Sequence, residues 1–526
     1  MRHHEANAKI ACNLAMFAGV ALGMMVLAAE AADVTWKGGG NTSAWSDGSN
    51  WDGGSAPGLG DIAVLPSGAI VRATIDDIDY AEATKLGGIH FSGDDTVLVV
   101  ANVAEARTFD IPFSGVGEFR VLDCTAKLTM KADNSSYMGS FVVSNAYVGY
   151  SSPSCMGTTN RVDYWGSASN SPIRYFAFDA NQSSTNEFHL HDSEWRFSGA
   201  YGARVCGPVY LHGSARVEGG GNEGDDKVFE LLGGVYRVDG SNGIFKPGNN
   251  CRLGGEKPVR LAVDEKLMCD RGILRIATDI ERAWKVSTKG TIVFERANCI
   301  SPSVMFQLGD STRYGCADLC GNDQRCGDFA VHQANMDSDR TWLYSEDPAT
   351  FTVCGSGPAD FNGLLMGALS LELNSTNSAT AGSIGLSGTN STSGAIIARR
   401  GAVTVLSAAT FPNLTELVAS DEGVVNLQMA AKLDSLRSIK VSGSGQVNFG
   451  TECLNDGLAE LEISDSGVVT LCGGSYRFYA LKTGDRYRAS GTYEVNGSVF
   501  GGAITGTGVV TVLTRPVTYG TIIIVR

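Results

Sequence analysis

Residues 420–427 (SDEGVVNL), 442–449 (SGSGQVNF) and 464–471 (SDSGVVTL) repeat one pattern at a fixed spacing of 22 residues. One glycine occupies the same place in each copy: Gly423, Gly445 and Gly467. Apolar residues recur before and after it with the same spacing: Leu414, Leu436 and Leu458; Val425, Val447 and Val469; Leu427, Phe449 and Leu471. The chain therefore contains an internal repeat, and the repeat decides the fold.

A fixed period of about 20–30 residues is typical of a solenoid. Within each copy the apolar residues alternate, which is the two-residue period of a β-strand. One coil cannot bury its own apolar face, so its stability comes from its neighbours. The repeat predicts an all-β parallel β-helix whose apolar columns stack inside, with the recurring glycine at a corner that needs positive φ. The rival interpretation is a leucine-rich repeat, because LDSLRSIKV (433–441) matches its leucine spacing, although Ser-x-x-Gly follows where that repeat has Asn.

The rest of the chain follows the same strand-and-turn pattern with a looser period. The N-terminus carries Arg2 and Lys9, then an apolar stretch and the small residues AEA before Ala32, which is the pattern of a secretory signal peptide. An uncleaved membrane anchor is the alternative. No later segment approaches the roughly 20 apolar residues of a spanning helix. We divide the chain into a signal peptide (1–31), a cap module (32–70), an irregular β-helix (71–394), regular coils (395–475) and a closing β module (476–526).

The formal net charge is −15, and no stripe of Lys and Arg interrupts the acidic background. Nucleic acids and anionic membrane surfaces are bound by clustered basic residues. The composition therefore argues against both partners.

Twelve cysteines follow the signal peptide, an even number. In an oxidising compartment such a set predicts disulfides. The regular coils place Cys472 above Gly450, and Cys453 three residues further on, so we expect a disulfide between Cys453 and Cys472. The alternative for Cys316, Cys320 and Cys326 is a metal site completed by Cys354, although no repeated CxxC pair is present.

Three of the seven tryptophans lie within WKGGGNTSAWSDGSNW, residues 36–51. Trp36, Trp45 and Trp51 can cover the open first coil of a solenoid, which otherwise exposes its core and a strand edge. Alternatively, the rings form a platform for sugars. Burial against one another favours the cap, and an exposed coplanar arrangement favours the platform.

The sequence also resembles a known family. LTMKADNSSYMGSFVVSNAYV, residues 128–148, is similar to the autotransporter-associated β-strand repeat, matching it at Leu128, Thr129, Asn134, Tyr137, Gly139, Val143 and Val148. Ala146 stands where the family usually has Gly. Residues 35–65 resemble the opening module of such proteins, and residues 479–512 resemble their closing module.

This resemblance covers the two ends and about a quarter of the chain. It implies a right-handed parallel β-helix with an N-terminal Trp/Gly-rich cap and a small C-terminal β module. It also implies a passenger-like protein exported by a Gram-negative bacterium to the outer cell surface or beyond, with the periplasm as the alternative location.

Candidate ligands for metals are few. His189 and His191 lie two apart on an expected strand, so both face one way, as metal-binding pairs do. Two acidic loops offer oxygen ligands for calcium, and neither has the full spacing of a known calcium loop. Their carboxylates are Glu223, Asp225 and Asp226 in the first loop, and Asp337 and Asp339 in the second.

The predicted function is structural or adhesive: an extended, secreted surface that binds glycans, matrix or other cells, with no catalytic residue and no cofactor. The alternative is a carbohydrate-active enzyme, a polysaccharide lyase or glycoside hydrolase, on the same scaffold. Such sites need carboxylates stacked on adjacent coils. In the regular coils Gly443 separates Asp421 from Asp465, and Ser438 separates Glu416 from Glu460.

Overall fold

The structure is a computed structural model, and its described part consists of fifteen segments of the chain. They are residues 31–78, 86–166, 176–178, 181–192, 194–198, 202–220, 228–241, 243–247, 250–310, 313–331, 341–376, 381–428, 433–450, 459–495 and 499–514. For residues 176–177, 194–198 and 216–220 the description covers the backbone alone. The signal peptide predicted for residues 1–31 lies almost entirely outside the described residues.

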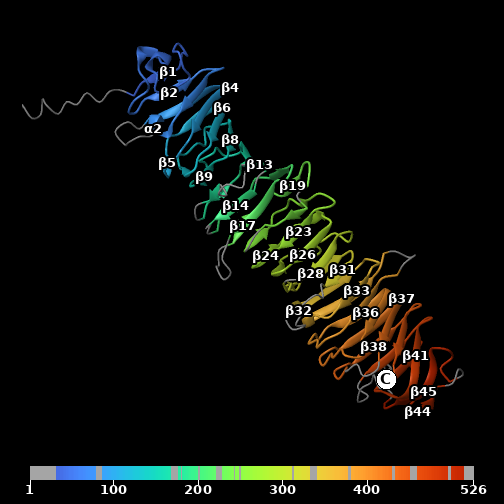
Figure 1. The fold of residues 1–526 in the computed structure, drawn as a ribbon. Coiled ribbons are helices and arrows are strands. Elements are labelled where there is room, and N and C mark those ends of the chain that lie inside the picture. Colours follow the sequence, from blue (N-terminus) through green and yellow to red (C-terminus); the bar gives the residue numbers. More distant parts are fainter. Residues whose placement is uncertain are drawn as a thin grey trace, which may run out of the picture.

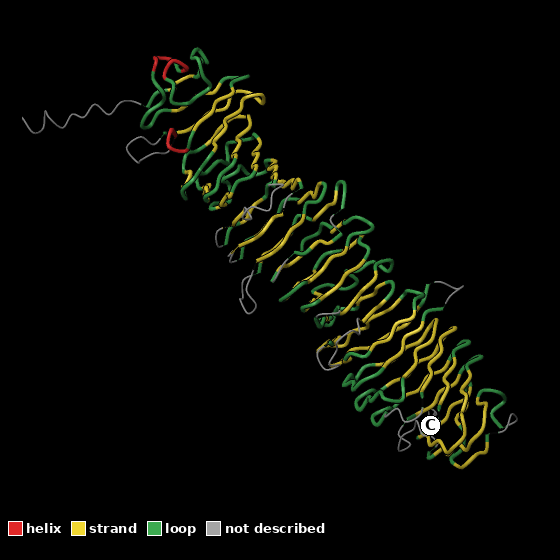
Figure 2. Tube along the Cα trace, viewed as in Figure 1, coloured by secondary structure: helices red, strands yellow, loops and turns green. Residues whose placement is uncertain are grey.

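The chain winds into one elongated rod, with the N-terminal coils at one end and the C-terminal coils at the other (Figure 1). Strands dominate it along its whole length (Figure 2). It is a parallel β-solenoid of about 16 turns, as the 22-residue repeat predicted. At about 4.8 Å per turn the coils extend about 80 Å.

Two large sheets run along the rod. The 12-stranded sheet of the N-terminal half contains β1 Asp33–Thr35, β2 Ile62–Leu65, β3 Ile70–Ala73, β4 Gly88–Ala101, β6 Phe113–Leu122, β8 Ser140–Ser144, β10 Arg161–Trp165, β13 Glu187–His191, β16 Val209–His212, β19 Val235–Arg237, β22 Val259–Arg260 and β25 Ile280–Arg282. The 22-stranded sheet contains β12 Ser183–Ser184, β15 Arg204–Val205, β18 Phe229–Leu231, β21 Cys251–Leu253, β24 Ile273–Ile276, β27 Thr291–Phe294, β29 Cys316–Asp318, β30 Gln324–Cys326, β32 Trp342–Val353, β33 Pro358–Phe361, β34 Leu364–Asn374, β35 Ser383–Leu386, β36 Ala395–Val405, β37 Glu416–Leu427, β38 Ser438–Val441, β39 Gln446–Phe449, β40 Glu460–Ile463, β41 Val468–Phe478, β42 Ala480–Thr483, β43 Arg486–Tyr487, β44 Gly491–Glu494 and β45 Ile504–Val512.

Three smaller sheets complete the coils. They contain β5 Arg107–Phe109, β7 Lys127–Met130, β9 Tyr147–Tyr150 and β11 Phe176–Phe178; β14 Glu194–Ser198 and β17 Arg216–Gly220; and β20 Ile244–Phe245, β23 Lys266–Cys269, β26 Lys285–Thr288, β28 Met305–Leu308 and β31 Phe329–Val331. Helical structure in the described residues is limited to α2 Ile75–Ile78 and the single turns η1 Gly48–Asn50 and η2 Asp52–Gly54.

The regular coils have the predicted register. Val425 pairs with Val447, and Val447 pairs with Val469, and all three side chains are buried. Leu427, Phe449 and Leu471 form a second buried column in the same way. Leu414 and Leu436 are also buried, whereas Leu458 lies outside the described residues. Each of these coils contributes two parallel strands, such as β38 and β39, where a leucine-rich repeat contributes one, so the register favours the parallel β-helix over the leucine-rich repeat.

The recurring glycines were predicted to have positive φ, and this prediction is wrong. Gly423, Gly445 and Gly467 do not have positive φ; the left-handed corner lies two residues earlier, at Asp421, Gly443 and Asp465. The glycines are needed because the coils approach closely. A Cβ at Gly423 would overlap the carbonyl oxygen of Ala398 in the preceding coil, and the next two glycines meet Ala419 and Val441 in the same way.

The motif that resembles the autotransporter-associated repeat has a clear physical role. The amide of Asn134 is buried and bridges coils, accepting from the Phe113 N–H at 2.6 Å and donating to the Cys155 carbonyl at 2.6 Å. Tyr137 is buried and donates to the Gly117 carbonyl at 2.9 Å. A Cβ at Gly139 would overlap that same carbonyl and the tyrosine ring. The motif thus satisfies the polar groups of a turn that is folded into the core.

The three tryptophans near the N-terminus are buried against one another. Trp36 and Trp51 lie edge to face at 5.0 Å, and Trp45 and Trp51 at 4.7 Å. The indole N–H of Trp51 donates to the Trp45 carbonyl at 2.8 Å. This arrangement excludes the exposed coplanar platform that sugar stacking would need. The cluster lies beside β1, the terminal strand of the 12-stranded sheet.

The C-terminal coil differs from the others in strand direction. β42 pairs with β43, and β44 pairs with β45, and both pairs are antiparallel. Strand β45 also continues the parallel stack by pairing with β41. The described strands therefore end in a local change from parallel to antiparallel pairing within the segment that we assigned to the closing module.

The disulfide prediction is wrong for the described cysteines, because no disulfide bond joins any two of them. Most of them point into the solenoid, where they serve as small apolar side chains. Cys472 is exposed, and Cys453, its expected partner, lies outside the described residues. The predicted register does hold, since Leu471 lies directly above Phe449.

We expect the cysteines to fall into two reactivity classes. Burial raises the pKa of Cys155 to about 11 and that of Cys269 to about 12, which suppresses the reactive thiolate. Iodoacetamide at pH 8, followed by peptide mass mapping, should label the exposed Cys206 and Cys472 at least about 100-fold faster than the buried thiols. Labelling at equal rates would contradict the burial of the core cysteines, and failure of the two exposed cysteines to react would contradict their accessibility. The buried set is Cys124, Cys155, Cys251, Cys269, Cys299, Cys326 and Cys354.

Candidate functional site

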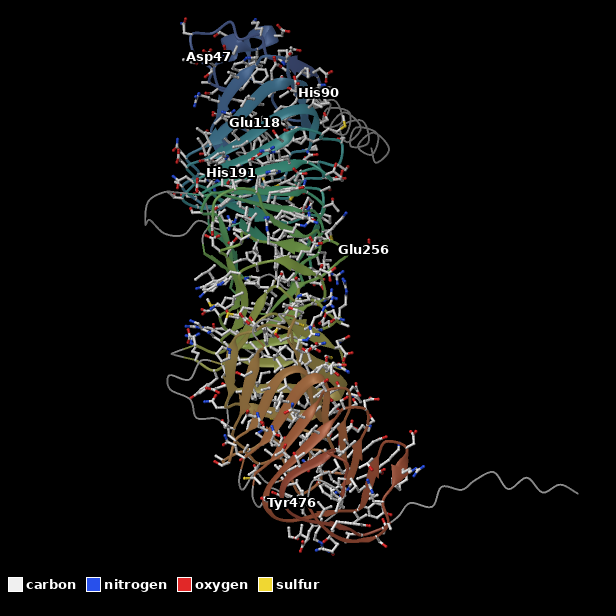
Figure 3. The ribbon with its side chains drawn as sticks, turned by 90° about the vertical axis from the view of Figure 1, so that its right-hand side faces the viewer. Asp47, His90, Glu118, His191, Glu256 and Tyr476 are labelled. Carbon is white, nitrogen blue, oxygen red and sulfur yellow. The ribbon has the colours of Figure 1, made fainter. Side chains whose placement is uncertain are left out.

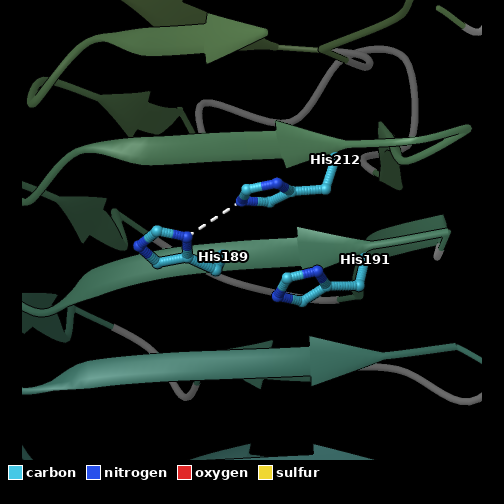
Figure 4. A group of neighbouring side chains, drawn as sticks. All are labelled: His189, His191 and His212. Atoms are coloured by element: carbon cyan, nitrogen blue, oxygen red, sulfur yellow. Dashed lines mark hydrogen bonds between the residues drawn. The ribbon is translucent and has the colours of Figure 1, made fainter. Parts of the chain in front are cut away.

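Three histidines meet on the outer face of the 12-stranded sheet. His189 and His191 project from β13, and His212 projects from β16, the next strand of the stack (Figure 4). Because His191 and His212 are register partners, their side chains lie one above the other. One ligand nitrogen of each ring lies within 4.8 Å of those of the other two, and Nδ1 of His189 is 2.9 Å from Nε2 of His212. We call these three residues the histidine cluster.

Each imidazole of the histidine cluster also faces a carboxylate. Nε2 of His189 lies 2.5 Å from Glu187, and Nε2 of His191 lies 2.7 Å from Asp163 on β10. Nδ1 of His212 lies 3.6 Å from Asp239. Carboxylates in this position fix the tautomer and orientation of an imidazole.

Aromatic rings flank the histidine cluster along the coil stack. Trp165 on β10 stacks on His191 with centroids 3.9 Å apart and planes 5° apart. Tyr210 on β16 stacks on His189 at 4.7 Å. The rings restrict rotation of the imidazoles, so the cluster is held in place from two sides.

The electrostatics of the cluster favour the neutral form of His212. Burial lowers the pKa of His212, and the neighbouring His191 and His189 lower it further by repelling a second positive charge. Burial raises the pKa of Asp163, but hydrogen bonds from Arg161 and His191 more than offset that effect, so the net shift is downward. A charged carboxylate and uncharged imidazoles are the protonation states that metal ligation requires.

The other metal candidates from the sequence do not contribute to this cluster. Glu223, Asp225 and Asp226 lie outside the described residues, as do Asp337 and Asp339. Among the described residues, Cys316, Cys320, Cys326 and Cys354 are not gathered into a group of three or more close ligands. Calcium binding by the two acidic loops therefore stays a prediction. The metal site that these four cysteines would make is not formed.

A second polar cluster lies on the five-stranded sheet. Lys266 on β23 and Lys285 on β26 are register partners on adjacent coils. The ammonium of Lys285 lies 4.4 Å from the ring centroid of Trp284 and donates to the Gln307 side chain at 2.7 Å. Trp284 is 53% exposed, the most exposed tryptophan among the described large hydrophobic side chains. We call Lys266, Lys285 and Trp284 the lysine–tryptophan patch.

The two lysines of this patch carry positive charge without a direct counter-ion. Neither of them forms an ion pair with a carboxylate of the described residues, unlike Lys289 nearby, which lies 2.6 Å from Asp310. Burial lowers the pKa of Lys266, Lys289 and Lys246 lower it further, and Asp310 and Asp270 offset part of this shift. Burial and Lys266 lower the pKa of Lys285. A bound anion would relieve this repulsion.

The carboxylates of the regular coils do not form an acid–base pair. Register places Ser438 between Glu416 and Glu460, as predicted, so the two carboxylates lie two coils, about 10 Å, apart. Glu416 is paired with Lys440 at 2.7 Å, and Glu460 accepts from Tyr487 at 2.7 Å. Glycosidases hold two carboxyl groups about 5–9.5 Å apart around the scissile bond.

An open hollow of about 490 Å³ is formed by β4, β6, β8 and β10 and the turns that lead into β8 and β10. Its lining includes Tyr137, Met138, Asn160, Arg161 and Asp94. Asp94 is the one carboxylate in that lining, so the hollow lacks a carboxylate pair.

Sequence reasoning found two members of the histidine cluster and missed the third. The sequence contains a pattern that could have revealed His212. HLH (189–191) aligns with YLH (210–212) when the coil is allowed to be shorter than the regular repeat. It also missed the lysine–tryptophan patch, because the intervening coils vary in length.

Comparisons with known proteins leave the interpretation to the structure: no family model, no curated sequence and no solved structure matches the chain. None of the helices in the described part of the chain has the length and apolar character of a membrane span.

Proposed function

We propose that the protein is an exported structural and adhesive β-solenoid that binds acidic carbohydrate on its wall. The lysine–tryptophan patch is the observation that carries this proposal. Export and exposure at the outer surface of a Gram-negative cell are supported by the signal-peptide pattern and by the resemblance to autotransporter-associated repeats.

The scaffold suits an extended binding surface. Buried columns continue from coil to coil, so the wall is a rigid lattice in which side chains recur at about 4.8 Å along the axis. A long polysaccharide can follow such a wall over several coils. Affinity then arises from repeated weak contacts rather than from one deep cavity.

The patch has the chemistry of an acidic sugar site. A pyranose ring offers an apolar face that packs on an exposed indole, and a uronate or sulfate group offers negative charge. Lys285 presents its ammonium group over the Trp284 ring, and Lys266 is its register partner on the adjacent coil; neither lysine forms an ion pair with a carboxylate of the described residues. Because the whole chain is acidic, the patch is a local exception that an anionic ligand would neutralise.

The test is binding of defined polysaccharides to the mature chain. An array of acidic and neutral glycans, followed by titration calorimetry, should show binding of a uronate-containing or sulfated polymer that weakens as salt rises. Lys266→Gln/Lys285→Gln should lower the affinity for the acidic polymer at least about 10-fold. Trp284→Ala should also lower it at least about 10-fold, and at every salt concentration, because ring packing does not depend on charge.

Two control variants match these changes. Lys131→Gln/Lys440→Gln removes the same charge elsewhere on the rod, and Trp165→Ala removes an exposed tryptophan outside the patch; both should bind normally. Equal loss in the controls, or preference for neutral glycans, would refute the proposal. Release of reducing ends or unsaturated products would instead identify the carbohydrate-active enzyme.

A further inference from the structure

We propose that His189, His191 and His212 form a binding site for a divalent transition-metal ion such as zinc. This site is independent of the proposed carbohydrate binding, because it lies on a different sheet and uses none of the residues of the lysine–tryptophan patch. It assigns a ligand to a cluster that is otherwise only a stack of rings.

The first argument is the number and type of ligands. Three imidazoles are a common protein ligand set for zinc, which leaves further positions for water or another ligand. All three rings offer ligand nitrogens within 4.8 Å of one another. Zn–N bonds of about 2.0–2.1 Å place two bound nitrogens about 3.3 Å apart in a tetrahedral site. The 2.9 Å between His189 Nδ1 and His212 Nε2 is already close to that value.

The second argument is the set of supporting carboxylates. Metal-bound histidines almost always direct their other nitrogen to a carboxylate, a carbonyl or water. Here Glu187 approaches Nε2 of His189 at 2.5 Å, which leaves Nδ1 of the same ring to face His212. Asp163 and Asp239 approach the other two rings. A stack of histidines with no ligand would not need one acidic partner for each ring.

The third argument is accessibility combined with rigidity. The His189 side chain is 10% exposed, and those of His191 and His212 are 13% and 18% exposed, so an ion can enter from solvent. Trp165 and Tyr210 stack on the cluster and limit its motion. Imidazoles that are already oriented lose little entropy on binding the ion.

The test uses the full mature chain without a polyhistidine tag, stripped of metal by a chelator and then freed of the chelator. Calorimetry with zinc sulfate and elemental analysis after gel filtration should show one ion per chain. Cobalt(II) should bind competitively and produce the visible absorption of a nitrogen-ligated ion. His212→Asn and His189→Asn should each weaken zinc binding at least about 100-fold, and Asp163→Asn about 10–100-fold.

His90 provides the matched control. It projects from β4, nearer the N-terminal end (Figure 3), and hydrogen-bonds Ser114 at 3.0 Å. His90→Asn should leave zinc affinity and stoichiometry unchanged. Should a cluster variant fail to fold, the wild-type protein still gives the answer: zinc should protect His191 and His212, but not His90, from diethyl pyrocarbonate.

Three outcomes would overturn the proposal. The first is a dissociation constant for zinc above about 100 μM, and the second is equal zinc affinity of the His90 and His212 variants. The third is modification of His191 and His212 by diethyl pyrocarbonate at the same rate with and without zinc.

Discussion

Replacing Glu265 with Gln is expected to destabilise the coils around it by about 3–5 kcal/mol, because it leaves a buried guanidinium without its counter-ion. The Arg237 side chain is 2% exposed and that of Glu265 is fully buried. Their two hydrogen bonds measure 3.0 Å from Nε and 2.5 Å from Nη2. Arg237 also donates to the carbonyls of Gly213 and Ala215, so every side of the guanidinium has a partner.

The position of Arg237 explains the size of the effect. Its partner in the preceding coil is Leu211, a fully buried residue, so the charge lies in an apolar column of the core. Removing one member of such a pair exposes the other to the full cost of desolvation. Replacing both residues, as in Arg237→Leu/Glu265→Met, should recover most of the stability that Glu265→Gln loses, because the leucine continues the apolar column of Leu211.

The measurement is native-state hydrogen exchange, which reports the free energy of opening for each coil. Amides of β16, β19 and β23 should exchange faster in Glu265→Gln, whereas those of β37 should not change. Glu281→Gln breaks an exposed pair with Arg260 and should destabilise the protein far less than Glu265→Gln, because solvent screens that pair. A Glu265→Gln protein as stable as Glu281→Gln would show that the core tolerates the unpaired arginine.

The sequence did not predict this buried ion pair, because it lies outside the coils of constant length. In the coils between residues 395 and 475 the length stays constant, so aligned positions in the sequence are neighbours in space, and both buried columns were predicted. Further towards the N-terminus the coil length changes. Phe188 pairs with Val209, and Val209 pairs with Val235, so the second of these coils is clearly longer than the first. Without a constant period the inward and outward positions cannot be counted.

The same variation concealed the two clusters. His212 joins His189 and His191 because the coil between β13 and β16 is shorter than the regular repeat, and Lys266 meets Lys285 across a coil that is shorter still. Turn length sets these registers, and turns accept insertions at little energetic cost. The sequence therefore predicted the residue types on one strand of the histidine cluster but not the strand that completes it.

The recurring glycines show a different kind of limit. A fixed spacing of glycines within the chain indicates that a side chain is excluded, but positive φ and close backbone approach both exclude it. Only the coordinates show that Gly423 faces the Ala398 carbonyl, while Asp421 has the left-handed conformation. Asp tolerates that conformation better than most residues, which is why the corner itself did not require glycine.

Replacing Trp51 with Ala is the second change from which we expect a large effect, a loss of about 3–5 kcal/mol in the stability of the first coils. Trp51 is fully buried and lies edge to face with both Trp36 and Trp45, so its removal leaves a cavity at the centre of the cluster. Trp36 also connects the cluster to the sheet, because its backbone N–H donates to the Val64 carbonyl at 2.9 Å. Faster hydrogen exchange is expected in β1 and β2 and should fade within a few coils, because each coil contacts only its neighbours.

The same variant tests whether the tryptophan cluster caps the solenoid. Trp284→Ala, which removes an exposed indole, is the stability control and should leave the first coils unchanged. If the tryptophans cap the solenoid, deleting residues 33–55 should lower stability or solubility while the lysine–tryptophan patch, which lies many coils further along the chain, keeps its affinity for carbohydrate. Buried rings have no face to offer to a sugar, so binding should not depend on them. Normal exchange in β1 and β2 in the Trp51→Ala protein would contradict the cap.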